Sequence, residues 1–402
     1  MPIVTLSTYT YNDANLVHGL LENVRSWSRA PDEILITDDG SDVPFTLERM
    51  PEPPFPPVRI QRLPRNRGFA AAKQAGIDAS SGDVVFSVDC DARPQPDYLK
   101  CCLEHLEDAG VGMVSGCCLA DVGGGSLGLY VRLFGDNYLV RETGPVDFIP
   151  GVAFALRKAV WNEVNGFAGH GRTTCEDHAL CAKLKAKGYR LIMDKDIRTI
   201  QTRRLSRHAQ CRRLWLWCGP ALLAGADDGA RLPDQFMAWY VLPLLERIRI
   251  CIERDCPGVI YHDLLHVIYA AFSVCRELAG TGRIPSASAR VLVTVLEKHF
   301  AGHTLVWSLL KRDLIALGAL PLPQGGESKS QNCLTTGNGQ ARARSPLWKS
   351  AEDWATPFAF LDVLSSSGTL SLLNNAEAPR LLAEDKIAAV DFSSYHPQEK
   401  LE

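Results

Sequence analysis

The feature that most constrains the fold is an alternation of short apolar runs with helical stretches over roughly the first 220 residues. Apolar runs at residues 3–6, 33–37, 58–62 and 83–88 predict strands, and residues 13–26, 68–79 and 96–106 predict the helices between them. Such alternation predicts an α/β fold with a mostly parallel sheet and flanking helices. In open sheets of this kind, ligands bind beyond the carboxyl ends of the strands. The residues that follow each strand are therefore the first candidates for a functional site.

The pattern changes in the rest of the chain. Residues 221–322 show helical spacing without convincing strands, so we expect an α-helical C-terminal extension there. From about residue 323 the sequence becomes polar and glycine-rich, which predicts a flexible linker and then a weakly structured tail to residue 402. The predicted division is therefore 1–220, 221–322 and 323–402.

Composition excludes several classes of protein. Forty-three Lys and Arg against 46 Asp and Glu give a net charge of −3, which argues against nucleic-acid binding through bulk positive charge. The N-terminus lacks the basic and apolar segments of a signal peptide, and we find no apolar run of membrane-spanning length. The 13 cysteines include no C-x-x-C spacing and are interpreted as small buried side chains. We expect a cytoplasmic protein.

Two carboxylates directly follow the strongest predicted strand, which has the sequence VVFSV. Asp89 and Asp91 stand two positions apart, so both can reach one hard divalent cation. Mg²⁺ or Mn²⁺ bridging a diphosphate fits this arrangement. An acidic solvated loop is the alternative interpretation of the same spacing.

A second acidic pair, Asp38 and Asp39, ends the strand at residues 33–37 and is followed by Gly40. A carboxylate held there can accept the imide N–H of a uracil or bind a ribose hydroxyl, and Gly40 permits a tight departure from the sheet. The same residue types also favour a helix N-cap or an Asx turn.

A third acidic pair, Glu176 and Asp177, precedes the apolar helix predicted at residues 179–187. A carboxylate that faces an acceptor hydroxyl can act as a general base. Capping of the helix N-terminus is the structural alternative.

Taken in chain order, these motifs resemble those of the family 2 glycosyltransferases. The resemblance covers residues of about 2 to 200, and it is the order of the motifs rather than any one of them that is specific. The motifs are Thr10-Tyr11-Asn12, Asp38-Asp39-Gly40-Ser41, Asn66-Arg67-Gly68, Asp89-x-Asp91, GVAFALR at residues 151–157, VNGF at 164–167, Glu176-Asp177 and LKAKGY at 184–189.

The resemblance implies a GT-A (Rossmann-like) fold and a nucleotide-diphosphate sugar as donor, usually a UDP-sugar. It also implies the site residues: Thr10, Tyr11 and one or both of Asp38 and Asp39 at the base with Arg67 beside them, Asp89 at the ribose or the metal, Asp91 at the metal, and Asp177 as catalytic base with Glu176 as second choice. The implied reaction inverts the anomeric centre as a hydroxyl attacks and the diphosphate leaves toward Mg²⁺ or Mn²⁺. A saccharide or lipid-linked acceptor in envelope or polysaccharide biosynthesis is expected, with possible peripheral membrane contact.

The chain departs from the family pattern at the end of the strand predicted from residue 190. Many relatives carry a metal-binding histidine there, whereas this chain has Gln201, and His208 follows seven residues later. A degenerate protein that binds nucleotide sugars without catalysis is therefore the alternative function. The processive motif Q-x-x-R-W is also interrupted, because Leu214 stands before Trp215.

A basic segment follows the same strand. It suits phosphate recognition or, with its tryptophans, a membrane interface. A solvated helix face is the alternative. The segment comprises Arg203, Arg204, Arg207, Arg212, Arg213, Trp215 and Trp217.

Overall fold

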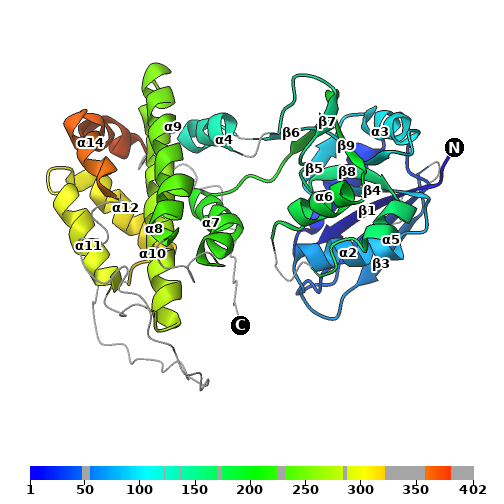
Figure 1. Ribbon diagram of the computed structural model, residues 1–402, viewed down its shortest axis with the longest axis horizontal. Coiled ribbons are helices and arrows are strands. Elements are labelled where there is room, and N and C mark those ends of the chain that lie inside the picture. The colour runs from blue at the N-terminus through cyan, green and yellow to red at the C-terminus, as the bar shows by residue number, and fades with distance from the viewer. Residues whose placement is uncertain are drawn as a thin grey trace. The chain divides into compact units, whose positions relative to one another are not determined.

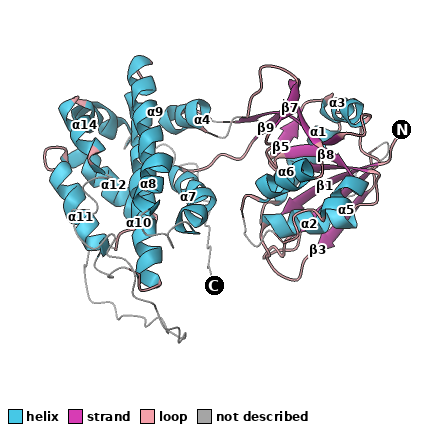
Figure 2. Ribbon diagram, in the orientation of Figure 1, coloured by secondary structure: helices cyan, strands magenta, loops and turns pink. Residues whose placement is uncertain are grey.

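The computed structural model describes residues 1–47, 55–121, 123–135, 138–169, 174–224, 231–283, 288–321 and 358–381. The chain divides into two compact units, Met1–Gly123 with Val131–Arg204 and Gly124–Tyr130 with Leu205–Glu402. The first unit carries a sheet flanked by helices, and the second is helical in its described part (Figures 1 and 2). The predicted α/β class with a helical C-terminal region is confirmed.

The first unit repeats strands and helices as the sequence predicts. Its elements are β1 (Val4–Thr10), α1 (Ala14–Val24), β2 (Glu33–Asp38), β3 (Val58–Arg62), α2 (Phe69–Ala79), β4 (Val84–Val88), β5 (Ala92–Pro94), α3 (Tyr98–Leu106), β6 (Val111–Ala120), β7 (Gly144–Val146), β8 (Ala153–Arg157), α5 (Lys158–Val164), α6 (Glu176–Ala186) and β9 (Arg190–Gln201). Helix α4 (Gly125–Phe134) spans the division between the units.

The sheet follows the order β3-β2-β1-β4-β8-β6-β9-β5, and β7 pairs with β9. Strands β3, β2, β1 and β4 pair in parallel, as predicted. Strand β8 then lies antiparallel between β4 and β6, while β6 and β9 are parallel to each other. The sheet is therefore mixed, and the carboxyl ends of β1, β2, β4, β6 and β9 still lie at one edge.

Both faces of the sheet are covered by helices because the central strands are apolar on both sides. On one face Phe86 of β4 packs with Trp27 and with Tyr98 of α3. On the other face Val85 belongs to a cluster with Ile77 of α2 and Trp161 of α5. The alternation of neighbouring β4 residues between two cores is what fixes the register of this strand.

Glycines hold the loops and helices that frame the functional edge close to the strands. Gly76 lets α2 approach the sheet, since a Cβ there would stand 2.7 Å from Oγ of Ser7 and 2.8 Å from Oγ1 of Thr37. Gly40 has a φ of +72°, which confirms the predicted sharp departure after β2.

The second unit consists of helices in its described part. They are α7 (Arg207–Ala224), α8 (Arg231–Phe236), the π-helix η2 (Met237–Val241), α9 (Leu242–Glu253), the 3-10 turn η3 (Pro257–Val259), α10 (Ile260–Gly280), α11 (Ser288–His299), α12 (Thr304–Ala316), α14 (Phe360–Ser366), α15 (Thr369–Leu372) and the π-helix η4 (Leu373–Glu377). By length and composition, Pro257–Gly280 is apolar enough to cross a membrane, but its most apolar 18-residue window is entirely buried among the other helices.

Two boundaries differ from the sequence expectation. The compact units divide after Arg204 rather than after residue 220, because α7 packs against α10. Residues 358–381 of the predicted tail form helices whose Phe358, Leu361 and Leu373 are fully buried in the second unit. Most of the predicted linker, residues 322–357, lies outside the described residues.

Candidate active site

The turn that carries Asp89 and Asp91 is held firmly by its neighbours. The backbone N–H of Asp89 donates to Val152, and Ala92 donates back to the carbonyl of Asp89. Thr202, just after β9, donates both its N–H (2.7 Å) and its Oγ1–H (2.9 Å) to the carbonyl of Asp91. These contacts fix the direction in which both carboxylates leave the sheet.

Lys73, on the inner face of α2, is the buried cation of the site. Its Nζ donates to the carbonyl of Gly151 (2.8 Å) and lies 3.1 Å from Oδ1 of Asp89 and 3.2 Å from Oε1 of Glu176. Burial alone would lower the pKa of Lys73, but the charges of Asp89, Glu176 and Asp177 outweigh it and raise the pKa. Lys73 therefore stays protonated and joins the β4 turn to the start of α6.

Burial has the opposite effect on Asp89. It raises the pKa of this carboxyl to about 7, against the attraction of Lys73, and the charges of Asp91 and Glu176 act in the same direction as burial. The site thus concentrates negative charge that a further cation would relieve.

The two acids at the start of α6 occupy different environments. Glu176 is 3% exposed and is used by Lys73. Asp177 is only partly buried, and its carboxylate accepts the N–H groups of Gly151 (3.1 Å) and His178 (2.8 Å). Asp177 is therefore oriented by the backbone while a side of it remains accessible, which suits a general base better than Glu176.

The acids after β2 also separate in role. Asp38 is fully buried and accepts from the N–H of Ser41, the N–H of Phe45 and Nη1 of Arg62. Burial would raise the pKa of Asp38, but these hydrogen bonds lower it below its usual range. Asp38 therefore holds the loop in place, and its place in the base pocket stays a prediction.

Asp39 faces the N-terminus of α2. Its two oxygens accept the backbone N–H groups of Arg67 and Gly68, both at 2.9 Å, and burial raises its pKa. Thr10, at the end of β1, is buried, and its Oγ1 has no hydrogen-bond partner among the described residues. Tyr11 and Arg67 are exposed nearby in the chain. This group is available to a ligand at the edge formed by β1 and β2.

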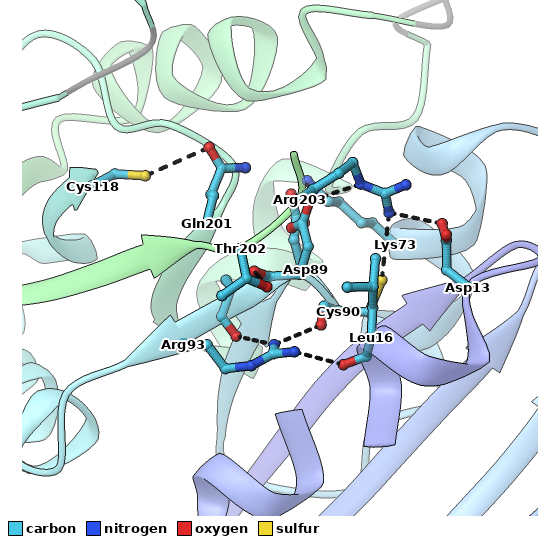
Figure 3. Close-up of polar contacts among 12 residues, drawn as sticks. Asp13, Leu16, Lys73, Asp89, Cys90, Arg93, Cys118, Gln201, Thr202 and Arg203 are labelled. Atoms are coloured by element: carbon cyan, nitrogen blue, oxygen red, sulfur yellow. Dashed lines mark hydrogen bonds and ion pairs between the residues drawn. The ribbon is translucent and has the colours of Figure 1, made fainter. Parts of the chain in front are cut away.

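Arg203, which follows β9, also reaches the acidic turn (Figure 3). Its Nε donates to Oδ2 of Asp91 (2.9 Å), and its Nη2 donates to Oδ2 of Asp13 (2.7 Å). Burial lowers the pKa of Arg203, but the two carboxylates outweigh it and raise the pKa. One guanidinium therefore links the ends of β1, β4 and β9.

The two residues considered for completing the metal site have other side-chain partners in the described part of the chain. Gln201 accepts from Sγ of Cys118 (3.8 Å), and Figure 3 shows its amide on the side of Cys118. His208 belongs to the second unit, where its Nε2 lies 3.1 Å from Oδ1 of Asp313.

The basic segment after β9 is divided between the two units. Arg203 binds the acidic turn, and Arg204 pairs with Asp121. In the second unit Arg207 pairs with Asp313, and Arg213 stacks over Trp217 at 4.4 Å. Most of these guanidinium groups therefore have structural partners.

The residues present fit a divalent cation to a limited extent. Oδ1 of Asp91 is buried and has no hydrogen-bond partner in the described part of the chain, so it is an open ligand. No group of three or more His, Cys, Asp or Glu among the described residues is placed to hold a metal. Mg²⁺ is commonly bound by one or two carboxylates together with substrate phosphates, so Asp91 and Asp89 would hold it with a diphosphate.

Sequence reasoning missed two residues of this site, Asp13 and Lys73, and gave Gly151 no role although it opens one of the family motifs. Lys73 had a detectable signal, because it shares a helical face with Ala72, Gly76 and Ile77, where a charge must be paired if it is buried. Arg203 was noticed only as part of a basic segment. Its individual partners are distant in sequence and left no local pattern.

An α/β domain with clustered carboxylates at the carboxyl edge of its sheet is thus defined by the structure alone. Residues 7–165 match the family described as "Glycosyl transferase family 2". Residues 7–165 therefore form a family 2 glycosyltransferase domain, the family that the sequence resemblance implied.

Curated relatives agree with this assignment. The chain is 30% identical over 144 residues to the succinoglycan biosynthesis protein ExoO of Rhizobium meliloti, covering 35% of this chain and 39% of the relative. It is 26% identical over 195 residues to the pre-mycofactocin glycosyltransferase of Mycobacterium tuberculosis, covering 47% and 40%. The chain thus spans about two fifths of the length of these relatives.

Among solved structures, the chain is similar to a mannosyltransferase from Pyrobaculum calidifontis in complex with GDP-Man and Mn²⁺. The TM-score is 0.41 at 19% identity, covering 79% of this chain and 86% of that one. It is also similar to GalNAc-T7 with UDP, GalNAc and Mn²⁺, with a TM-score of 0.41 at 15% identity, covering 51% and 44%.

Proposed function

We propose that this chain is a glycosyltransferase that moves a sugar from a nucleotide-diphosphate sugar to an acceptor hydroxyl. The observation that carries the proposal is the convergence of Asp89, Glu176 and Asp177 on Lys73 and Gly151 at one sheet edge. A domain of the family that also places an accessible carboxylate beside this cluster has the parts that sugar transfer needs. A UDP-sugar donor, as the sequence resemblance implies, is part of the proposal.

Asp177 is proposed as the base that takes the proton of the acceptor hydroxyl. Its two backbone hydrogen bonds hold it in one orientation, so its remaining lone pairs can face the acceptor. Direct attack by the hydroxyl on the anomeric carbon would invert that centre. Asp39, Thr10 and the start of α2 are proposed to hold the nucleoside.

A divalent cation on Asp91 and Asp89 is proposed to accompany the diphosphate. When bound, it would act as a Lewis acid on the departing phosphate oxygens. The acceptor is proposed to be a saccharide or a lipid-linked molecule on the cytoplasmic side of the membrane.

The test is a panel of UDP- and GDP-sugars with Mn²⁺ or Mg²⁺, scored first by thermal stabilisation and then by release of the nucleoside diphosphate. A bound donor stabilises the folded state by mass action, so the correct one should raise the melting temperature most. Turnover of that donor supports the proposal. Absence of turnover with every donor that binds would contradict it.

The second candidate is a protein that binds nucleotide sugars without catalysis. It is favoured by one observation: Asp91 and Asp89 are already paired with Arg203 and Lys73, and Gln201 turns toward Cys118. In that case UDP should bind equally well with and without Mn²⁺, and no donor should be turned over.

A further inference from the structure

Arg203, near the end of the first unit, places a positive charge on Asp91, the carboxylate that would bind a cation. Arg203 Nε donates to Oδ2 of Asp91, while Oδ1 of the same carboxylate is buried and without a hydrogen-bond partner in the described part of the chain. Thr202 anchors the backbone beside it to the Asp91 carbonyl. The guanidinium is thus placed by the fold, and its side chain is 30% exposed.

Charge explains why a guanidinium is held there. Asp13, Asp89 and Asp91 lie close to Arg203 or to one another. Arg203 donates to Asp91 through Nε and to Asp13 through Nη2. Without a positive partner, Asp91 would be a buried and unpaired charge, which is costly. A divalent cation bound by Asp91 would take over this role, but it would lie beside the guanidinium and be repelled by it.

Asp13 gives Arg203 a second anchor. The Nη2–Asp13 bond of 2.7 Å does not involve Asp91, so Arg203 can keep it when its Nε bond is lost. The side chain of Asp13 makes no capping hydrogen bond to α1 and is therefore available for this contact.

We propose that Arg203 is the resident counter-cation of Asp91 and competes with a divalent cation for that carboxylate. Without a bound cation, Arg203 neutralises Asp91. With a cation held by Asp91, Arg203 would lose its Nε bond and keep its Nη2 bond to Asp13. This inference rests on the proposed function, since it concerns the cation that would accompany the donor diphosphate, and it makes Arg203 a positioning residue.

The experiment measures Mn²⁺ affinity of the whole protein by electron paramagnetic resonance, without nucleotide and at constant ionic strength. R203Q should bind Mn²⁺ at least about tenfold more tightly than the wild type, because it removes a like charge next to the ligand. R204Q is the matched control, since Arg204 pairs with Asp121 and not with the acidic turn. Its affinity should stay within about twofold of the wild type.

Two results would overturn the proposal: R203Q binding Mn²⁺ no more tightly than the wild type, or R204Q tightening it equally, which would indicate a general charge effect. If R203Q does not fold, R203M replaces it. The methionine also removes the positive charge, so Mn²⁺ affinity should again rise by at least about tenfold; an affinity equal to the wild type would overturn the proposal. Sugar transfer by the wild type is measured separately, so a failure of the Arg203 proposal can be distinguished from a failure of the proposed function.

Discussion

At the scale of single residues, the contacts in the structure distinguish acids that stand side by side in the sequence. Asp38 and Asp39 are neighbours in the chain, yet the first is used by its own loop and the second by the start of α2. Glu176 and Asp177 are likewise adjacent, but only Glu176 is paired with Lys73. Residue type and spacing placed these acids in pairs, whereas their contacts distinguish the members of each pair.

Asp91→Ala should abolish sugar transfer and weaken Mn²⁺ binding. The change removes the open Oδ1 ligand and leaves Arg203 without its partner on the turn. We expect transfer to fall by at least about 100-fold, because charge on the leaving phosphate is no longer stabilised. Product release is measured with saturating donor.

Asp121→Ala is the control for this variant, because Asp121 also pairs with an arginine but is not one of the acids of the turn. Full turnover in Asp91→Ala would contradict the assigned role of the Asp91 carboxylate in sugar transfer.

Asp177→Asn should retain donor affinity and lose transfer by about 100- to 1,000-fold, because the amide cannot accept the proton of the acceptor. Donor affinity is measured by calorimetry and transfer by product release. Asp147→Asn, an exposed carboxylate on the same unit, serves as control. If transfer is unchanged in Asp177→Asn, the base lies elsewhere and Glu176 is the next residue to test.

At the scale of elements, buried polar side chains fix how helices pack. Asp313 on α12 is fully buried and accepts from Tyr261 of α10 (2.7 Å), while Arg207 and His208 of α7 lie at 3.4 and 3.1 Å. Asn374 of η4 accepts the N–H of Leu305 and so caps the start of α12. The helical unit is thus joined by contacts between elements that are far apart in the sequence.

Asp313→Asn should destabilise the helical unit by about 2 to 3 kcal/mol at neutral pH. Burial would raise the pKa of Asp313, but the hydrogen bonds and charges of its partners lower it to about 2. Since the folded pKa lies below the unfolded value, this contribution is complete above pH of about 4 and is lost as the pH falls through about 2. Denaturant unfolding at several pH values measures it.

The control is Asp362→Asn, because Asp362 pairs with His299 at an exposed position. Equal stability losses in the two variants at pH 7 would contradict the assigned role of Asp313.

At the scale of the whole molecule, the two units differ in what they bury. The sheet unit buries Lys73 against its acidic partners Asp89 and Glu176. The helical unit encloses histidines as well: burial lowers the pKa of His262 and of His266 to about 3 and raises the pKa of Asp263 to about 6. The stability of this unit therefore depends on pH.

Lowering the pH from 7 to 5 should destabilise the helical unit. The two histidines accept protons in the unfolded chain below pH of about 6.5 but not in the folded one, which costs about 2 kcal/mol each at pH 5. Asp263 has the opposite sign, since its raised pKa favours the folded state as the pH falls, and it offsets about 1 kcal/mol. We expect a net loss of about 3 kcal/mol by denaturant unfolding.

His266→Phe keeps an aromatic ring against Tyr240 and removes one of the titrating groups. It should reduce the pH-dependent loss by about 2 kcal/mol. A loss as large as that of the wild type would show that His266 does not contribute.

The sequence by itself determined the order of strands and helices in the first unit, the acids at the strand ends and the helical character of the second. These properties are local, because apolar periodicity and turn residues act over a few positions. The tertiary structure alone decided that β8 makes the sheet mixed, that residues 358–381 pack as helices, and which cation holds which acid. Lys73 contacts Glu176, 103 positions away in the sequence, and Arg203 contacts Asp91, 112 positions away. Only the folded chain brings charges with such sequence separations into contact.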